Sequence, residues 1–145
     1  MYAMPPRKEP KGAGVMSMNE TLGLPRDKMR TINIAFDVDG TLRCNGGKKH
    51  HAAGIQDKCD EHCQEPNDRI VTLFNILSRF KNVNLWVWSG GGKKYAEQFA
   101  RQYNLPVKPA QCISKLDNQR YSMDIAIDDI QDTALATVNL IVREK

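Results

Sequence analysis

The sequence predicts an α/β fold, a Rossmann-like three-layer arrangement with a mainly parallel sheet between helices. Short runs of apolar and β-branched residues alternate along the chain with segments of helical periodicity. The strand-like runs are almost continuously apolar, which is typical of parallel strands covered on both faces. With 145 residues, the chain is long enough for one such domain with a substantial core.

Five strands are predicted, each a short apolar run. They cover residues 31–38, 83–89, 111–114, 124–129 and 139–142. Gly40 bounds the first strand, and residues 90–92, all glycine, bound the second. The run at 111–114 is the weakest of the five.

Helices are predicted between these strands. Residues 67–80 place apolar side chains at helical spacing, with Asn67 or Asp68 as the N-cap. A second helix ends before Pro106. Its apolar face consists of Tyr95, Ala96, Phe99, Ala100 and Tyr103. A third, short helix is predicted at residues 131–137.

Residues 42–66 are polar, contain glycine and lack periodicity, which predicts a small flap-like insertion. Cysteine and histidine gather in it at spacings that zinc ligands use. The candidate ligands are Cys44, His50 or His51, Cys59, His62 and Cys63. The segment is either a structural zinc site that staples the insertion or an exposed loop whose cysteines bind nothing.

Residues 1–30 differ from the rest in composition, and we predict a flexible basic tail followed by one domain at residues 31–145. The tail has few aromatic or β-branched residues to bury. It accounts for most of the net charge of +4. Such a tail either contacts nucleic acid or is simply a solvated leader.

Polar side chains follow four of the predicted strands where each strand ends. They are Asp37 and Asp39, Ser89, Lys115, and Asp128 with Asp129. In an α/β sheet, ligands bind outside the carboxyl ends of the strands. Four carboxylates converging there repel one another unless a cation neutralises them, and oxygen ligands suit Mg²⁺. The sequence therefore predicts a Mg²⁺ site formed by Asp37, Asp39, Asp128 and Asp129.

Plainer alternatives exist for each of these residues. Two acids at the end of a strand often form only a turn or a helix cap, and Ser89 is equally suited to be the N-cap of the next helix. The basic residue of the site is Lys115 or, alternatively, Lys108.

Together these motifs resemble those of the haloacid dehalogenase superfamily of phosphohydrolases. "DVDGTL" resembles its first motif, Ser89 in "VWSGG" the second, Lys115 the third and "IAIDD" the fourth. The resemblance covers residues 31–142. It implies a Mg²⁺-dependent phosphatase with an aspartyl-phosphate intermediate.

The resemblance also implies a role for each site residue. Asp37 is the nucleophile, and Asp39 is the general acid and base. Mg²⁺ is held by Asp37, the main-chain carbonyl of Asp39 and Asp128, with Asp129 assisting. The phosphoryl oxygens are bound by Ser89, the amide of Gly90 and Lys115, while Thr41 supports the loop by hydrogen bonding.

The insertion is too short for the separate cap domain of many superfamily members, so we expect an essentially capless enzyme. Within the superfamily, the chain most resembles the phosphatase domains of phage polynucleotide kinase/phosphatases. "KCD" at residues 58–60 has the same relative place, but Gly91-Gly92 replaces an arginine often found there. The expected substrate is a phosphorylated small molecule, such as a nucleotide, or a nucleic-acid phosphate end.

The alternative function is a catalytically idle module that binds nucleic acid or a protein through its tail and insertion. In both cases we expect a cytoplasmic protein without a membrane span, because no apolar run approaches the length needed. The sequence gives no basis for an oligomeric state.

Overall fold

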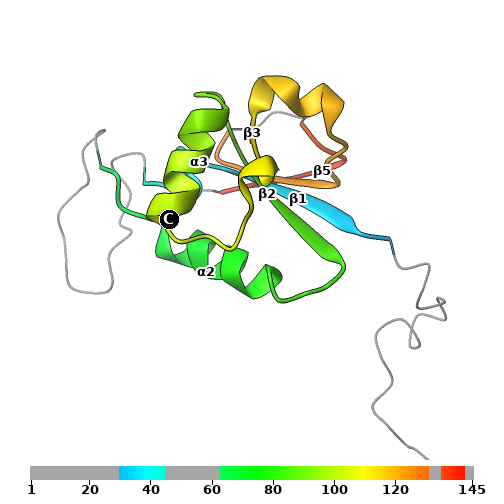
Figure 1. Cartoon of the computed structure of the whole chain (residues 1–145), viewed down its shortest axis with the longest axis horizontal. Helices are drawn as coiled ribbons and strands as arrows, with labels where there is room; N and C mark the ends of the chain where they lie inside the picture. Colours follow the sequence, from blue (N-terminus) through cyan, green and yellow to red (C-terminus); the bar gives the residue numbers. More distant parts are fainter. Residues whose placement is uncertain (1–29, 45–62, 131–134, 143–145) are drawn as a thin grey trace, which may run out of the picture. The chain divides into compact units, whose positions relative to one another are not determined.

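The computed structural model describes residues 30–44, 63–130 and 135–142. The described residues form an α/β fold with one sheet of five parallel strands, in the order β3-β2-β1-β4-β5 (Figure 1). The strands are β1 (Ile32–Asp37), β2 (Val83–Ser89), β3 (Cys112–Ser114), β4 (Ile125–Asp128) and β5 (Val138–Ile141). The parallel sheet predicted from the apolar runs is thus confirmed, and the strand limits agree within two residues.

Two α-helices connect the first three strands, α2 (Asp68–Leu77) and α3 (Lys93–Gln102). Asn67 is the N-cap of α2, one of the two predicted residues. The predicted helix 67–80 is too long at its end. The Ser78 hydroxyl donates to the Asn75 carbonyl, and the chain then turns through Phe80 into β2. After α3, Asn104 has a positive φ of 51°, which ends the helix before Pro106.

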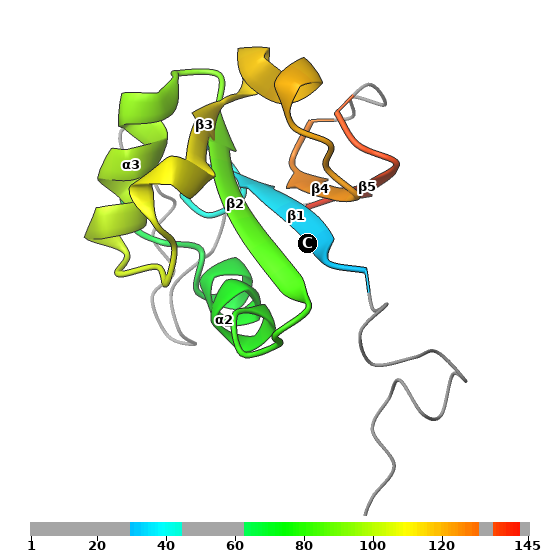
Figure 2. The same cartoon turned by 45° about the vertical axis from the view of Figure 1, so that its right-hand side comes forward.

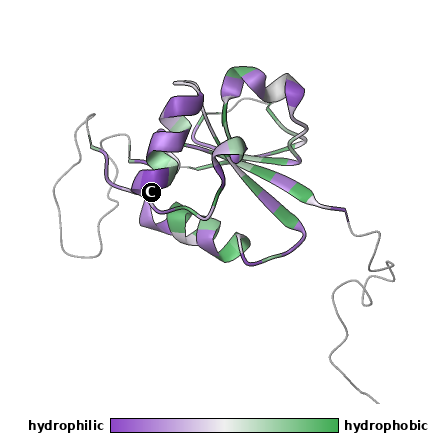
Figure 3. Ribbon diagram, viewed as in Figure 1, coloured by the Kyte–Doolittle hydropathy of each residue, from purple (hydrophilic) through white to green (hydrophobic). Residues whose placement is uncertain are grey.

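Both α-helices cover one face of the sheet (Figure 2). The steps from β1 to β2 and from β2 to β3 run the same way along the sheet, so right-handed crossovers place both helices on the same side. Phe74 of α2 and Phe99 of α3 pack there with Phe36 and Val87 of the sheet. Hydrophobic and hydrophilic residues alternate along α2 and α3, as expected of helices with one buried face (Figure 3).

The opposite face has a second, smaller core of Ala35, Trp88, Ile113, Met123 and Ala126. Within the described ranges, the chain that leads back from β3 over this face contains the 3₁₀ helix η3 (Lys115–Arg120) and no α-helix. The expectation of a sheet covered on both faces is thus met by a core on each face. In the described part, the step from β3 to β4 is made by η3 and an irregular segment.

The helix predicted at 131–137 also needs correction. Residues 131–134 lie outside the described residues, and residues 135–137 are not helical. The Asn139 side chain donates to the Ala136 carbonyl. Leu135 and Ala136 pack against the smaller core as irregular chain.

The ends of the predicted insertion belong to the domain itself. Leu42 is fully buried in the main core, and Arg43 pairs with Pro66 in an antiparallel bridge. The amide of Cys44 donates to the Glu65 carbonyl. The segment between these paired ends, residues 45–62, lies outside the described residues.

Three of the predicted zinc ligands, His50, Cys59 and His62, lie in that segment, as does the alternative His51. Of the remaining two, Cys44 is buried and Cys63 is partly exposed. Of the predicted tail, residues 1–30, all but Arg30 also lie outside the described residues. In the part that is described, the helices are too short and too polar to cross a membrane.

Candidate active site

The strand order creates a switch point between β1 and β4. From β1 the chain moves outward through β2 and β3, then returns to the other side of β1 to form β4 and β5. With right-handed crossovers, the connections on the two sides of such a point leave the sheet on opposite faces. Open α/β sheets bind their ligands in the crevice expected there, outside the carboxyl ends of the strands.

The strand register brings the predicted site residues to that crevice. Phe36 pairs with Ile127, so Asp37 and Asp128, the next residues, end neighbouring strands at the same level. On the other side of β1, Asp37 pairs with Trp88, which places Ser89 one residue further out. These pairings put the side chains of three strands within reach of one another, since neighbouring strands lie about 4.8 Å apart.

Three carboxylates meet at the switch point, and we call Asp37, Asp128 and Asp129 the acid cluster. One carboxylate oxygen from each lies within 4.8 Å of the other two, a separation that a single cation can bridge. Asp37 and Asp128 are only 4% and 3% exposed. One oxygen of Asp128 also accepts a hydrogen bond from the Ile130 amide, which fixes its orientation.

Lys115 joins the acid cluster from two strands away. Its Nζ lies 2.9 Å from Asp37 Oδ1 and 2.6 Å from Asp128 Oδ2. As the first residue of η3, it extends past β2 with its long side chain to reach these acids. Lys108, the alternative, is exposed and precedes β3, at the opposite ends of the strands. Of the two lysines, Lys115 is therefore the one that lies in the site.

The electrostatics of the acid cluster are dominated by burial and by Lys115. The pKa of Asp37 is raised to about 7, chiefly by burial; Lys115 lowers it, and the nearby Asp128 and Asp129 raise it. For Lys115, burial opposes the charged form, but Asp37 and Asp128 outweigh it and raise the pKa. Lys115 thus stays charged beside these acids.

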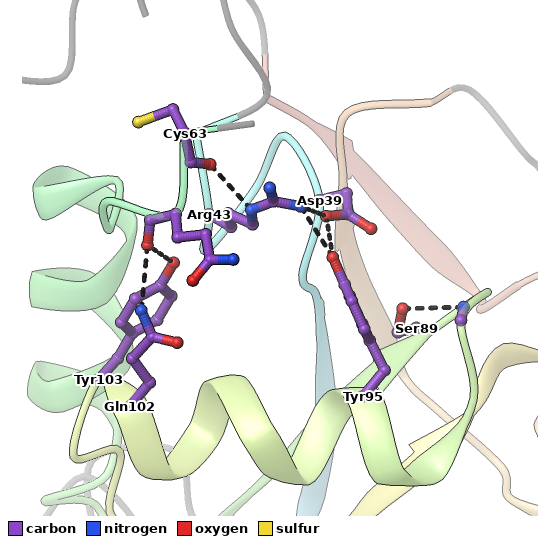
Figure 4. Close-up of polar contacts among 9 residues, drawn as sticks. Asp39, Arg43, Cys63, Ser89, Tyr95, Gln102 and Tyr103 are labelled. Atoms are coloured by element: carbon purple, nitrogen blue, oxygen red, sulfur yellow. Dashed lines mark hydrogen bonds and ion pairs between the residues drawn. The ribbon is translucent and has the colours of Figure 1, made fainter. Parts of the chain in front are cut away.

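Asp39 lies outside the acid cluster and has partners of its own (Figure 4). β1 ends at Asp37, and the chain turns at Gly40, whose φ is 75°. Asp39 Oδ1 accepts hydrogen bonds from Arg43 Nη1 at 2.8 Å and from the Tyr95 hydroxyl at 2.7 Å. It stays a prediction that the main-chain carbonyl of Asp39 helps to bind Mg²⁺.

Sequence reasoning missed Arg43 and Tyr95. Tyr95 was assigned to the apolar face of its helix, and Arg43 was counted in the insertion. The available signal was the spacing of Asp39 and Arg43, four residues apart, but that spacing suggests an ion pair only in a helix. Their meeting with Tyr95 depends on how α3 packs beside the turn after β1.

Ser89 and the glycines after it form a tight turn. The Ser89 hydroxyl accepts a hydrogen bond from the Gly91 amide at 3.0 Å, and the N-cap of α3 is Gly92 rather than Ser89. The Ser89 hydroxyl proton therefore remains available to a ligand. Beside Gly90, a Cβ atom would meet no other atom within 4 Å, so the space there is open.

Thr41 does not make the side-chain hydrogen bond that was expected of it. Its hydroxyl is buried and has no hydrogen-bond partner among the described residues, while its amide donates to the Val38 carbonyl at 3.3 Å. The turn after β1 is held by the main chain instead, through the amides of Leu42 and Arg43.

Comparisons with protein-family models, with curated proteins and with solved structures found no match for this chain. What the site does is therefore inferred from its residues and their geometry. The arrangement combines an acid cluster with the spacing of a cation site, a half-buried lysine, a hydroxyl beside an open glycine turn, and a separately held carboxylate. Each of these groups has a use in phosphoryl transfer.

Proposed function

We propose that the chain is a Mg²⁺-dependent phosphomonoester hydrolase that works through an aspartyl-phosphate on Asp37, with a haloacid dehalogenase-like fold. The observation that carries the proposal is the acid cluster at the switch point with Lys115 between two of its members. A cluster of this kind is costly to bury and has no use in holding the fold together.

The acid cluster fits a hard divalent cation. Its three members offer carboxylate oxygens within 4.8 Å of one another, and Mg²⁺ prefers oxygen ligands. Burial is the main cause of the raised pKa of Asp37, and a bound cation would favour the ionised form. Asp37, Asp128 and Asp129 would hold the ion, and when bound it offsets the charge on the transferring phosphoryl group.

The chain's own residues then carry out two displacements. An Asp37 carboxylate oxygen attacks phosphorus, and the bond from phosphorus to the leaving oxygen breaks as Asp39 gives that oxygen a proton. In the second displacement, water attacks the aspartyl-phosphate while Asp39 takes up its proton. Inorganic phosphate leaves, and Asp37 and Asp39 return to their starting states.

Three donors surround the position of the phosphoryl oxygens in this scheme. Lys115 lies beside Asp37, and the Ser89 hydroxyl and the Gly90 amide border the open space at the turn. Donors held in place before the reaction stabilise the transition state without a cost of reorganisation.

The substrate is a phosphorylated small molecule or a nucleic-acid phosphate end. Half of the Asp39 side chain, 49%, is exposed, so a leaving group of considerable size can approach it. The expected nucleic-acid contact through residues 1–29 would favour a polymeric substrate. The resemblance to polynucleotide phosphatases points the same way.

A catalytically idle binding module is the second candidate, and Lys115 favours it. Its ammonium pairs with both Asp37 and Asp128, which lowers the need for a metal. Such a module binds nucleic acid in a salt-sensitive way without turnover, and loses that binding when residues 1–30 are removed.

The deciding experiment measures hydrolysis of 4-nitrophenyl phosphate with and without Mg²⁺ in the full chain. We expect Mg²⁺-dependent turnover that falls by about 10³-fold or more in Asp37→Asn, because the nucleophile is lost. Asp68→Asn, an exposed acid at the start of α2, is the matched control and keeps its activity. Turnover that persists in Asp37→Asn would remove Asp37 as the nucleophile, and a wild-type protein without turnover would favour the binding module.

A further inference from the structure

We propose that Arg43 and Tyr95 are positioning residues that hold the Asp39 carboxylate for proton transfer to the leaving oxygen. The inference rests on the proposed phosphatase function. It adds two residues that neither the motifs nor the acid cluster include, and it assigns them one measurable effect, on substrates whose leaving group needs a proton.

The three side chains form a closed triangle of hydrogen bonds (Figure 4). Arg43 Nη1 donates to Asp39 Oδ1 at 2.8 Å and to the Tyr95 hydroxyl at 2.8 Å, and that hydroxyl lies 2.7 Å from Asp39 Oδ1. A guanidinium has donors only, so the Tyr95 oxygen accepts from Arg43 and its proton points to Asp39. The triangle therefore has a single arrangement of protons.

Both donors bind the same carboxylate oxygen. Oδ1 receives Arg43 and Tyr95, which fixes the rotamer of Asp39, while 49% of the side chain remains exposed. Oδ2 is then the oxygen that a substrate can approach. A fixed carboxylate with one accessible oxygen is what general acid–base catalysis requires, since the reacting atoms must lie within hydrogen-bond reach.

The two anchors are themselves held by the core. Arg43 is only 14% exposed, donates through Nε to the Cys63 carbonyl at 2.9 Å, and lies 5.3 Å from the ring centre of the buried Phe99. The Tyr95 ring packs on the same Phe99 at 4.9 Å. Because of these contacts, Arg43 and Tyr95 have little freedom to move, and their hydrogen bonds therefore hold Asp39 in place.

Gly91 provides the room that Tyr95 needs. A Cβ atom at this position would lie 3.1 Å from the Tyr95 ring, closer than ordinary van der Waals contact. The glycine found where an arginine is often expected therefore has a local reason. It lets the aromatic ring lie against the turn after β2 and extend its hydroxyl to Asp39.

The triangle also favours the chemistry that Asp39 performs. When the bond between phosphorus and the leaving oxygen breaks, the Asp39 proton moves to that oxygen and Asp39 becomes a carboxylate. Arg43 and Tyr95 donate to that carboxylate and keep it in the same position after the proton has moved. The same carboxylate then accepts the proton of the attacking water.

The test compares two substrates that differ in their need for a proton. Phenyl phosphate releases a phenol, whose pKa of about 10 resembles that of tyrosine, and its leaving oxygen needs protonation. 2,4-Dinitrophenyl phosphate releases a stable anion that does not. The value of kcat/KM reports the first displacement, where the leaving group departs.

In the full chain with Mg²⁺, we expect Tyr95→Phe to lower kcat/KM about tenfold for phenyl phosphate and less than about twofold for the dinitrophenyl ester. Tyr103→Phe is the matched control. It lies just after α3, its ring also packs on Phe99, and its hydroxyl donates to the Gln64 carbonyl away from Asp39. This control is expected to leave the ratio between the two substrates unchanged.

An equal loss with both substrates, or no loss with either, would show that the triangle only ties the turn to α3 and would overturn the inference. If Tyr95→Phe does not fold, as judged by circular dichroism, Arg43→Lys decides by the same ratio. Failure of the phosphatase proposal has a different signature, since the wild-type protein would then hydrolyse neither ester in a Mg²⁺-dependent way.

Discussion

Two acids, Asp37 and Asp39, stand two residues apart and occupy opposite surroundings. Asp37 is buried at the end of β1, faces two further carboxylates, and has a pKa raised to about 7. The Asp39 side chain is half exposed on the following turn and accepts hydrogen bonds from a guanidinium and a phenol. Asp37 thus lies between one lysine and two carboxylates, whereas Asp39 is surrounded by donors.

The contrast teaches how one short motif can supply two different reagents. In the proposed function, a cation would complete the environment of Asp37, which suits a residue that binds metal and attacks phosphorus. The environment of Asp39 is already complete and keeps one oxygen accessible, which suits proton transfer. Two carboxylates whose surroundings differ in this way are a recurring basis for separate catalytic roles.

The largest expected effect tests this division directly. Asp37→Asn should lower kcat/KM by about 10³-fold or more for both phenyl phosphate and 2,4-dinitrophenyl phosphate, since every substrate needs the nucleophile. Asp39→Asn should lower it about 10²-fold for phenyl phosphate and less than about tenfold for the dinitrophenyl ester. If the two variants respond alike to the leaving group, the division of roles is broken.

The next effect concerns stability without metal. Because the folded-state pKa of Asp37 is raised, the folded chain holds a proton between about pH 4 and pH 7 that the unfolded chain has lost. Stability therefore falls as the pH rises through this window, and above it the full cost of burying the charge applies. Asp37→Asn removes that cost.

In urea unfolding with a chelator at pH 8, we expect Asp37→Asn to be more stable than wild type by about 2–4 kcal/mol. The difference should shrink as the pH is lowered towards 4. Asp39→Asn, which removes a half-exposed ion pair, should instead cost less than about 1 kcal/mol. A destabilised Asp37→Asn at pH 8 would mean that Lys115 already neutralises the acid cluster.

The smallest expected effect concerns the pH dependence of Mg²⁺ affinity, and it again compares Asp37 with Asp39. Mg²⁺ must displace the proton from Asp37, so its affinity should rise about tenfold per pH unit up to about pH 7 and level off above. Calorimetric titration of the wild-type protein between about pH 5.5 and 8 measures this slope, because this range includes the raised pKa of about 7. Asp39→Asn should keep the slope and Asp37→Asn should lose it; an affinity independent of pH would contradict the raised pKa.

Much of the fold could be predicted because its signals are local. The apolar runs that became β1 and β2 are recognisable from composition, and the glycines that follow them mark where the strands stop. The prediction failed where a segment has weak propensity and its conformation depends on packing. Residues 135–137 are irregular, and Leu135 and Ala136 pack against the smaller core, which periodicity along the chain does not reveal.

The candidate site shows the same division between features that local sequence predicts and features that depend on packing. Asp37, Asp39, Asp128 and Asp129 were expected together because parallel strands bring their carboxyl ends to one edge. Three of these carboxylates do meet, but the prediction was wrong for the Asp39 carboxylate, which binds Arg43 and Tyr95 instead. The choice between Lys115 and Lys108 needed the structure, since it depends on which end of β3 each lysine occupies. Arg43 and Tyr95 could not be assigned from the sequence because they meet only where α3 packs beside the turn after β1.

The sequence by itself determined the parallel α/β class, the places where strands end, and the acids that stand at those ends. The alternation of polar and apolar residues and the apolar runs involve residues that are close together in the sequence. Local physical rules are therefore enough to interpret them. Only the tertiary structure decided the strand order that puts β4 beside β1, and the different partners of Asp37 and Asp39. Those contacts join residues far apart in the chain, and packing of the whole domain selects them.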